Sequence, residues 1–280
     1  MSKSLKDGLS VLICCRNSAE CIGDVLESIK QQNPGEIIIV DGNSKDETIE
    51  IAKKFTSLIY NDEGKGLGYA RKLGVSKSSY KYICIISPDD LISENFISTS
   101  LQEIKNCSHE TVALLARKKF SKPKSFWDKG QDAIYKLVQT FPIRVVGNPS
   151  IYKTNIFGKF SYDITFNANE DTDLCERWAR AGYQVEWAKN LWTIEIENRD
   201  YKGFKERYQW YGEGDYRFVK KWFSIDKNTS FRHFFHPFKN YMIKYPFYLI
   251  LKGRFGAALF SFLCGINRYK GFLNEFLTQR

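Results

Sequence analysis

Short apolar runs alternate with amphipathic segments along the first half of the chain. Residues 9–14, 36–40 and 82–87 are apolar and rich in branched side chains, which is typical of strands buried on both faces of a parallel sheet. This alternation indicates right-handed βαβ units and a mainly parallel α/β sheet flanked by helices. The first helix is predicted where apolar residues recur on one helical face, at Ile22, Val25, Leu26 and Ile29.

The same pattern predicts the elements that follow. Ser44 and Glu47 have the spacing of a helix capping box and lead into an apolar stripe that ends at Phe55. Asn169 and Gly182 are residue types that begin and end helices. Further strands are expected at residues 57–60, 111–116, 183–188 and 191–196, and further helices at residues 67–77 and 170–181.

The C-terminal part of the chain differs in character. Residues 201–223 are aromatic and basic and follow a helical face, although Gly212 weakens that helix. Two apolar stretches follow at residues 245–251 and 255–266, both shorter than the roughly 20 residues that a bilayer-spanning helix needs. We therefore expect amphipathic segments in the interface of an anionic membrane, with packing on the rest of the protein as the alternative.

The composition indicates a folded, basic protein. With 280 residues, 43% of them hydrophobic, the chain can bury a full core, and its net charge of +10 implies anionic partners. Its seven cysteines show no CxxC spacing, which disfavours a disulfide framework or a zinc site. The N-terminus lacks the apolar stretch of a signal peptide. We expect a cytoplasmic protein, peripheral on the inner face of the membrane, with no transmembrane span.

Acidic residues fall where a parallel sheet binds ligands. Asp41 ends the second strand, Asp89 and Asp90 follow the strand that Pro88 ends, and Asp171 begins a helix. The carboxyl ends of parallel strands meet at one edge of the sheet, so these acids can converge on one ligand. Mg²⁺ or Mn²⁺ is the natural partner of such carboxylates and a diphosphate. Turn and helix-start chemistry is the alternative explanation for the Asp pair.

At this point the chain resembles the inverting glycosyltransferases of family 2, which have the GT-A fold. The resemblance covers roughly residues 9–214, and its motifs occur in the expected order. The matching segments are LSVLICCRN at residues 9–17, IIVDGNSKDET at 38–48, the glycine and arginine element at 64–74, SPDD at 87–90, NEDTDL at 169–174 and QWYG at 209–212.

The resemblance implies roles for individual residues. Asp171 would be the catalytic base, and Asp89 would bind the metal, Mn²⁺ or Mg²⁺. Nucleotide-binding residues would be Cys14, Arg16, Asp41, Lys65, Arg71, Ser87 and Asp89, while Asp90, Gly147, Glu170, Arg207 and Trp210 would contact the acceptor or the diphosphate. Residues 1–215 would form the nucleotide-sugar-binding catalytic domain and residues 216–280 an amphipathic helical extension at the membrane interface.

Two positions depart from the family pattern. Ser87 stands where the metal-binding segment usually begins with an acid, so a ribose contact made by a carboxylate becomes a hydroxyl contact or disappears. Cys14 and Cys15 replace the usual small polar pair after the first strand, and thiols make poorer hydrogen bonds. The resemblance therefore implies modest donor affinity.

The implied reaction displaces the nucleotide diphosphate, of the UDP or GDP type, from the anomeric carbon of a sugar. The acceptor would be a hydroxyl of a glycan or a lipid-linked saccharide, and nucleic acid is not an expected partner. One alternative is an NAD(P)-dependent oxidoreductase, but the glycine-rich residues 64–68 follow the third strand rather than the first and lack the third glycine. The other is a non-catalytic basic module that binds membrane or nucleic acid.

Overall fold

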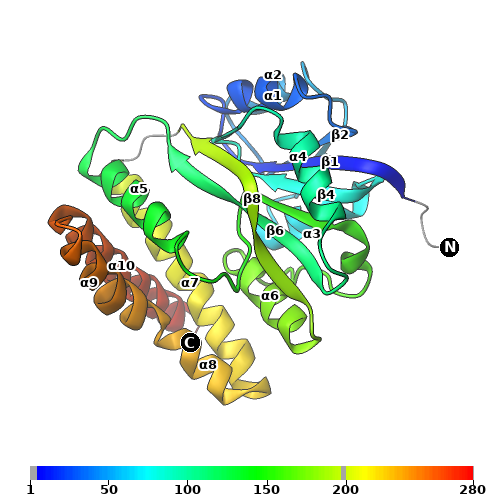
Figure 1. Cartoon of the computed structure of the whole chain (residues 1–280). Coiled ribbons are helices and arrows are strands. Elements are labelled where there is room, and N and C mark those ends of the chain that lie inside the picture. The colour runs from blue at the N-terminus through cyan, green and yellow to red at the C-terminus, as the bar shows by residue number, and fades with distance from the viewer. Residues whose placement is uncertain (1–4, 197–199, 280) are drawn as a thin grey trace. The chain divides into compact units, whose positions relative to one another are not determined.

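The computed structural model describes residues 5–196 and 200–279 and divides them into two compact units (Figure 1). The first unit contains residues 5–121 and 142–196, and the second contains residues 122–141 and 200–279. The boundary expected at residue 215 lies inside a continuous helix, α7 (Tyr201–Ile225). Residues 122–141 also join the second unit, because a helix within them packs into its apolar core.

An eight-stranded sheet forms the centre of the first unit, with the strand order β3-β2-β1-β4-β7-β6-β8-β5. The strands β3, β2, β1 and β4 are parallel to one another, whereas β7 is antiparallel to both β4 and β6. The strands are β1 (Lys6–Cys15), β2 (Glu36–Asp41), β3 (Ile59–Asn61), β4 (Tyr80–Ile86), β5 (Asp90–Ile92), β6 (Thr111–Phe120), β7 (Ser150–Lys153) and β8 (Gln184–Glu195).

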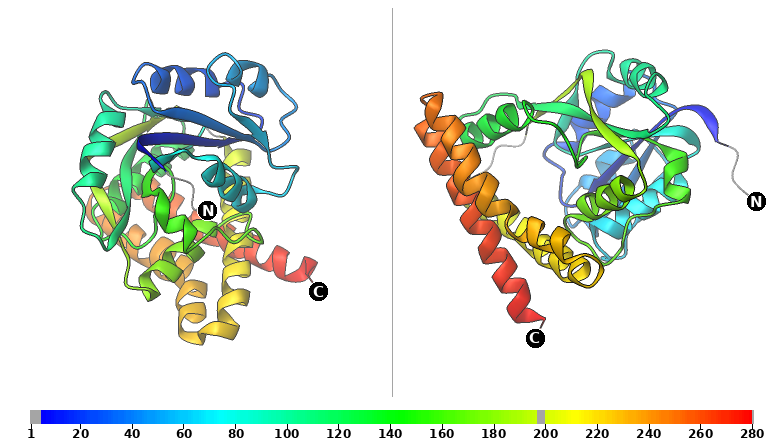
Figure 2. Two further views of the ribbon diagram at one scale, coloured as in Figure 1. Left: turned by 90° about the vertical axis from the view of Figure 1, so that its right-hand side faces the viewer. Right: turned by 60° about the horizontal axis from the view of Figure 1, so that its bottom comes forward.

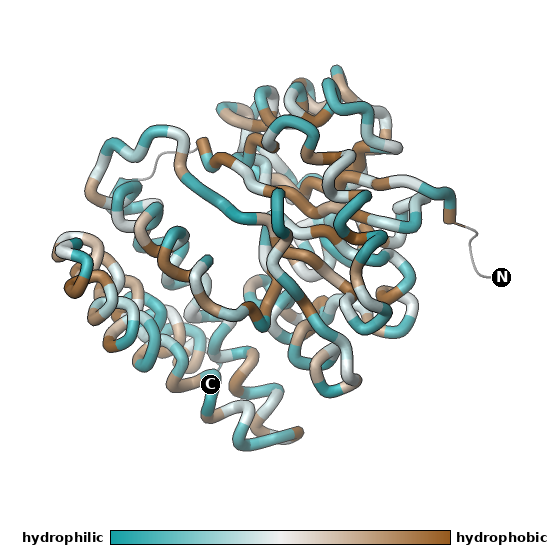
Figure 3. The backbone as a smooth tube through the Cα atoms, viewed as in Figure 1, coloured by the Kyte–Doolittle hydropathy of each residue, from teal (hydrophilic) through white to brown (hydrophobic). Residues whose placement is uncertain are grey.

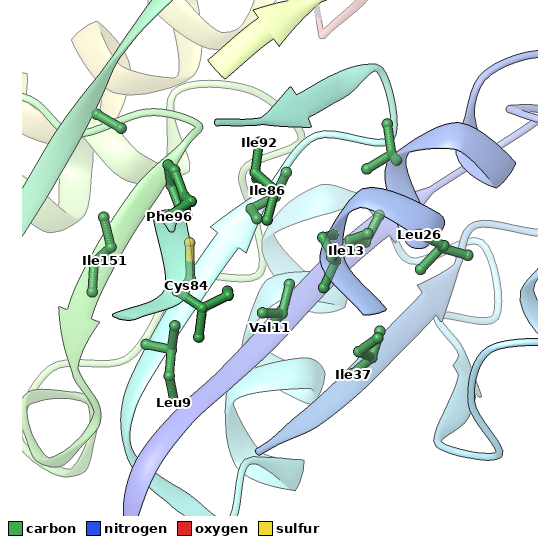
Figure 4. Packing of buried hydrophobic residues seen from close by; sticks show 14 of the residues in the cluster. Leu9, Val11, Ile13, Leu26, Ile37, Cys84, Ile86, Ile92, Phe96 and Ile151 are labelled. Atoms are coloured by element: carbon green, nitrogen blue, oxygen red, sulfur yellow. The ribbon is translucent and has the colours of Figure 1, made fainter. Parts of the chain in front are cut away.

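Apolar clusters cover both faces of this sheet. Leu9, Val11 and Ile13 of β1 point into one cluster (Figure 4), and Leu12 points into the other. This division follows from the alternation of side chains along a strand. The helices that flank the sheet are α1 (Ile22–Lys30), α2 (Thr48–Ala52), α3 (Leu67–Lys77), α4 (Phe96–Lys105), η1 (Thr154–Gly158) and α6 (Glu170–Arg180). The predicted α/β class with helical flanks is confirmed.

Some local predictions were wrong. The capping box at Ser44 does not form, because α2 begins only at Thr48 and the Ser44 backbone N–H donates to the Asp41 carboxylate. Strand β4 ends at Ile86, one residue before the predicted Ser87. The two strands expected at residues 183–196 form one strand, β8, because it pairs along β6 on both sides of a register shift.

The second unit is helical. Its helices are α5 (Phe126–Val138), α7, α8 (Lys227–Phe234), the π-helix η2 (Pro237–Lys244), α9 (Tyr245–Leu251) and α10 (Phe255–Thr278). Gly212 does not interrupt α7, because it allows close approach to α10: a Cβ added there would collide with the Arg268 carbonyl. No helix in the described part of the chain is both long and apolar enough to cross a membrane.

Candidate active site

A buried arginine connects three elements of the first unit. Arg71 lies in α3 with its side chain 5% exposed, and its Nη1 is 2.6 Å from Oε1 of Glu170. The same Nη1 lies 3.7 Å from Oδ2 of Asp171, and Nη2 donates to Oδ1 of Asn148 at 3.2 Å. Arg71 therefore joins α3 to the first turn of α6 and to the loop that precedes β7.

The contact chain continues to the carboxyl end of β4. Asn148 Nδ2 donates to the hydroxyl of Ser87 at 3.3 Å, and Ser87 follows the last residue of β4. Gly147 lies beside the candidate base, because a Cβ added there would be 3.4 Å from Oδ2 of Asp171. The structure thus brings Arg71, Ser87, Gly147 and Asp171 together, whereas the convergence of Asp41, Asp89 and Asp171 on one ligand stays a prediction.

The neighbouring acids Glu170 and Asp171 have different environments. The Glu170 side chain is 2% exposed, and burial raises its pKa to about 7 although the Arg71 guanidinium acts in the opposite direction. Burial alone would lower the pKa of Arg71, but Glu170, Tyr162 and Asp171 together raise it well above its usual range. Arg71 therefore stays charged beside these acids.

Asp171 is the more accessible of the two acids. Its side chain is 20% exposed, and its Oδ1 accepts a hydrogen bond from the Thr172 backbone N–H at 2.7 Å. It lies in the first turn of α6, at the positive end of the helix dipole. An accessible carboxylate in this position can accept a proton from a bound hydroxyl.

Several buried polar atoms beside the site have no hydrogen-bond partner in the part of the chain that the structure describes. Among them are Nε of Arg71 and Oε2 of Glu170. Buried polar groups are normally hydrogen-bonded, so the Arg71–Glu170 pair is incompletely bonded within the described residues.

Asp41 anchors a second group of contacts along the same sheet edge. Its carboxylate accepts from the backbone N–H of Ser44 at 3.1 Å and from Asn61 Nδ2 at 3.3 Å. Asp41 pairs in register with Cys15 of β1 and Asn61 of β3, so the three strand ends are level. Arg16 lies next to this group, because its Cβ is 3.3 Å from the Cβ position of Gly42.

Cys14, one residue before the end of β1, lies within electrostatic range of Arg71, Glu170 and Asp62. Burial raises the pKa of its thiol to about 12, an effect that Arg71 opposes and that Glu170 and Asp62 strengthen. The thiol is therefore protonated at neutral pH. Cys14 can contact a nucleotide only as a weak, neutral hydrogen-bonding group.

Asp89 and Asp90 have separate positions. Asp90 is fully buried in β5, where Lys118 Nζ lies 2.7 Å from its Oδ2 and 3.5 Å from Oε2 of Glu195. Burial raises the pKa of Asp90 to about 7, against the effect of Lys118. This ion pair favours a structural role for Asp90 over the predicted ligand contact. Asp89 lies in the turn between β4 and β5 and is 7% exposed.

A divalent cation fits this donor set only with help from a ligand. Residues 5–196 and 200–279 contain no group of three or more His, Cys, Asp or Glu side chains that could hold a metal ion. Mg²⁺ and Mn²⁺ are commonly held by one or two carboxylates together with substrate phosphate oxygens and water. A cation at Asp89 would therefore depend on a bound diphosphate.

The glycine-rich segment before α3 has a packing role. Gly66 has φ +89° and lies against the Asn167 side chain, and a Cβ at Gly68 would be 2.5 Å from the Phe166 carbonyl oxygen. The glycines thus let α3 approach the loop that precedes α6, which holds Arg71 near Glu170. Lys65 lies in this segment but is exposed and pairs with Glu63 at 2.5 Å.

Arg207 and Trp210 lie in the second unit. Arg207 Nε donates to the hydroxyl of Tyr211 at 3.0 Å, and its Nη2 donates to the hydroxyl of Tyr135 at 3.4 Å. The Trp210 ring packs 5.4 Å from that of Tyr211. The Arg207–Tyr135 bond joins α7 to α5, and a contact of either Arg207 or Trp210 with acceptor or diphosphate stays a prediction.

The sequence did not reveal several residues of the site. Asn148, which the sequence analysis did not single out, connects Ser87 with Arg71. Tyr162 is buried, and its ring lies 5.8 Å from Cζ of Arg71. Asn61 and Ser44, which bond to Asp41, follow a strand and an acid respectively, and polar residues at strand ends were the available signal.

The model of the family described as glycosyl transferase family 2 matches residues 10–168. Glycosyltransferase GlyG of Streptococcus pneumoniae is 28% identical over 112 residues, which are 37% of this chain and 37% of the relative. Poly-beta-1,6-N-acetyl-D-glucosamine synthase of Staphylococcus aureus is 23% identical over 245 residues, 80% of this chain and 59% of the relative. The chain therefore spans less than two thirds of the length of these curated relatives.

Solved structures share the fold at low sequence identity. TarS of Staphylococcus aureus has a TM-score of 0.51 and 15% identity, covering 95% of this chain and 55% of that one. Glucosyl-3-phosphoglycerate synthase of Mycobacterium tuberculosis, in complex with Mn²⁺, UDP-glucose and phosphoglyceric acid, has a TM-score of 0.51 and 13% identity, covering 70% and 74%. These matches confirm the predicted GT-A fold. The family match favours a transferase over the oxidoreductase and the non-catalytic module.

Proposed function

Because the chain belongs to glycosyl transferase family 2, we propose that it transfers a sugar from a nucleotide diphosphate to an acceptor hydroxyl with inversion at the anomeric carbon. The carrier is UDP or GDP, and the acceptor is a glycan or a lipid-linked saccharide. The observation that supports this most strongly is the contact of Arg71 with Glu170, Asp171 and Asn148 at the ligand-binding edge of the sheet.

Asp171 acts as the base in this proposal. The acceptor oxygen attacks the anomeric carbon, the bond from that carbon to the diphosphate oxygen breaks, and the hydroxyl proton passes to the Asp171 carboxylate. Arg71 and Glu170 position this carboxylate from the buried side, while its partial exposure leaves it open to the acceptor. Attack from the face opposite the leaving group gives inversion.

The donor binds along the ends of β1, β2 and β4. Asp41 accepts a hydrogen bond from the nucleobase of the donor, and Arg16 lies beside it. The Ser87 hydroxyl contacts the ribose. Asp89 would hold Mg²⁺ or Mn²⁺ together with the diphosphate, and the bound cation would stabilise the negative charge of the leaving group. Complexes of a structural neighbour with Mn²⁺ and UDP-glucose support this assignment at the level of the fold.

The helical unit makes peripheral contact with an anionic membrane in this proposal. Such a contact would bring the enzyme to a lipid-linked acceptor without a membrane-spanning helix. The helical unit is rich in basic and aromatic residues, which supports a position at the membrane interface.

Substitution of the proposed base tests the mechanism. Asp171→Asn should leave calorimetric binding of the nucleotide nearly unchanged while transfer from a panel of UDP- and GDP-sugars falls by roughly 10²–10⁴-fold. Glu176→Gln is the matched control, because it removes a carboxylate from a later turn of the same helix. Equal loss of binding and transfer in Asp171→Asn would remove Asp171 from the role of base.

A further inference from the structure

The turn between α9 and α10 lies at one end of the helical unit (Figure 2), and large apolar side chains around this turn are exposed. Phe247 is 59% exposed, Ile250 47%, Leu251 67% and Phe255 67%. Isolated exposed apolar residues are common, but a contiguous group of this kind marks an interaction site. We call residues 247–255 the apolar tip.

The fold itself holds these side chains outward. Tyr245 and Leu249 of α9 and Phe260 of α10 are buried in the core of the helical unit. Gly253, with φ +68°, closes the turn, and the backbone N–H of Arg254 donates to the Leu249 carbonyl at 2.8 Å. Because the opposite faces of both helices are packed, the tip cannot turn its apolar residues inward.

The charge around the tip has one dominant sign. Lys252 and Arg254 lie within the tip itself, and both are exposed. Figure 3 shows hydrophilic and hydrophobic residues next to each other at the end of this hairpin. Across residues 227–279 Glu275 is the only acid, whereas the basic residues are Lys227, Arg232, Lys239, Lys244, Lys252, Arg254, Arg268 and Lys270.

We propose that the apolar tip docks on an anionic lipid bilayer, with Leu251 and Phe255 in the boundary between headgroups and acyl chains and with Lys252 and Arg254 at the lipid phosphates. Alternating apolar and cationic side chains match the two layers of a membrane interface, and anionic lipid attracts each exposed cation. A second copy of this chain is a poorer occupant, because its tip would carry the same positive charge.

The contact continues along α10. Leu259 and Phe262 are 55% and 40% exposed and follow Phe255 on the same helical face. An interfacial helix buries such a stripe in the plane of the membrane. This inference rests on the membrane contact of the proposed function and specifies the residues that make it. It does not depend on the chemistry assigned to Asp171.

Vesicle co-sedimentation of the full chain tests the proposal. Wild-type protein should bind vesicles of phosphatidylcholine with phosphatidylglycerol and bind those of phosphatidylcholine alone much more weakly, and added salt should weaken the binding. Leu251→Ser with Phe255→Ser should lower the affinity by at least about tenfold, because each removes a buried apolar side chain. Lys252→Gln with Arg254→Gln should lower it by about fivefold for each cation.

Phe223→Ser with Ile225→Ser is the matched control. These residues are 48% and 58% exposed at the C-terminal end of α7, away from the turn between α9 and α10 (Figure 1), so their loss should change vesicle affinity little. Equal loss in the control and the tip variant would overturn the proposal, as would unchanged binding of the tip variant. A dimer that the tip variant dissociates would also overturn it, since the occupant would then be a second copy.

Transfer to a soluble acceptor separates this proposal from the proposed function. The tip variant should keep that activity, since none of its substituted residues lies at the candidate active site. Loss of vesicle binding with transfer retained supports the docking surface. Vesicle binding in a protein that transfers no sugar would contradict the catalytic proposal and leave the docking surface supported.

Discussion

The two units each bury an arginine against an acid, but the two pairs are bonded differently. In the helical unit, Arg268 donates to both oxygens of Asp215 at 2.7 and 2.5 Å, and His233 Nε2 lies 2.7 Å from Oδ1 of Asp215. Burial would raise the pKa of Asp215, but Arg268 and His233 lower it well below its usual range. In the first unit, Arg71 faces Glu170, whose pKa burial raises.

This difference is the one expected between a charge that only stabilises the fold and a charge that takes part in the proposed function. The Asp215 carboxylate is held from two helices and is almost fully buried, so it has nothing left to offer a ligand. Arg71 instead divides its contacts among Glu170, Asp171 and Asn148, and one of these partners is open to solvent. An incompletely bonded buried charge beside an accessible acid is costly for stability, and such groups collect at functional sites.

Removal of the structural acid should have the largest effect. Asp215→Ala leaves Arg268 buried without its partner, and breaking such a pair costs about 3–5 kcal/mol in the free energy of unfolding. Urea denaturation measures this loss. Glu275→Ala is the control within the same two helices, because its pair with Arg217 is partly exposed and should contribute less than about 1 kcal/mol. If both substitutions lower the free energy of unfolding equally, the fully buried pair is no more important to stability than the partly exposed one.

Arg71→Lys should affect transfer more than folding. A lysine ammonium cannot reach Glu170, Asp171 and Asn148 from one position, so Asp171 loses its orientation while one ion pair survives. Loss of hydrogen bonds to charged groups predicts a fall in kcat of roughly 10–100-fold. Arg180→Lys, in an exposed pair with Glu176 of α6, is the control and should leave kcat unchanged. If Arg71→Lys lowers the free energy of unfolding but leaves kcat unchanged, Arg71 is a purely structural residue.

Asp215 should make the free energy of unfolding depend on pH in the acid range. The pKa of Asp215 is lowered in the folded protein, so its contribution is fully present above its unfolded value of about 3.9 and is lost as the pH falls below it. The difference in unfolding free energy between wild-type protein and Asp215→Asn should therefore shrink between about pH 5 and pH 3. A constant difference over that range would show that folding does not lower the pKa of Asp215.

Local signals predicted much of the fold. The helices α3 and α9 have the bounds that the sequence predicted, since a glycine-rich segment precedes one and apolar residues fill the other. The sequence did not predict the start of a helix where one residue can make two alternative hydrogen bonds. Ser44 could cap a helix, but its backbone N–H bonds to Asp41, which delays α2 to Thr48.

Long-range packing determined the rest. Gly212 weakens α7 in isolation, yet α10 crosses at that point and requires a residue without a side chain. Asp90 was expected at a ligand because it follows a strand end, but the pairing of β5 with β8 places it beside Lys118 of β6. Asn148 joins Ser87 to Arg71 only in the folded chain, so nothing in its local sequence could reveal that role.

The smallest effect is expected at Cys14, which lies within electrostatic range of Arg71 in the first unit. Its thiol is protonated, because burial raises its pKa to about 12. A hydroxyl of similar size makes better hydrogen bonds, so Cys14→Ser should tighten nucleotide binding by up to about fivefold, the worth of one neutral hydrogen bond. Calorimetric titration with UDP and GDP measures this. Cys107→Ser, at a half-buried thiol beyond α4, should leave the affinity unchanged. Unaltered affinity in Cys14→Ser would place the nucleotide away from the end of β1 and from the charges around Arg71.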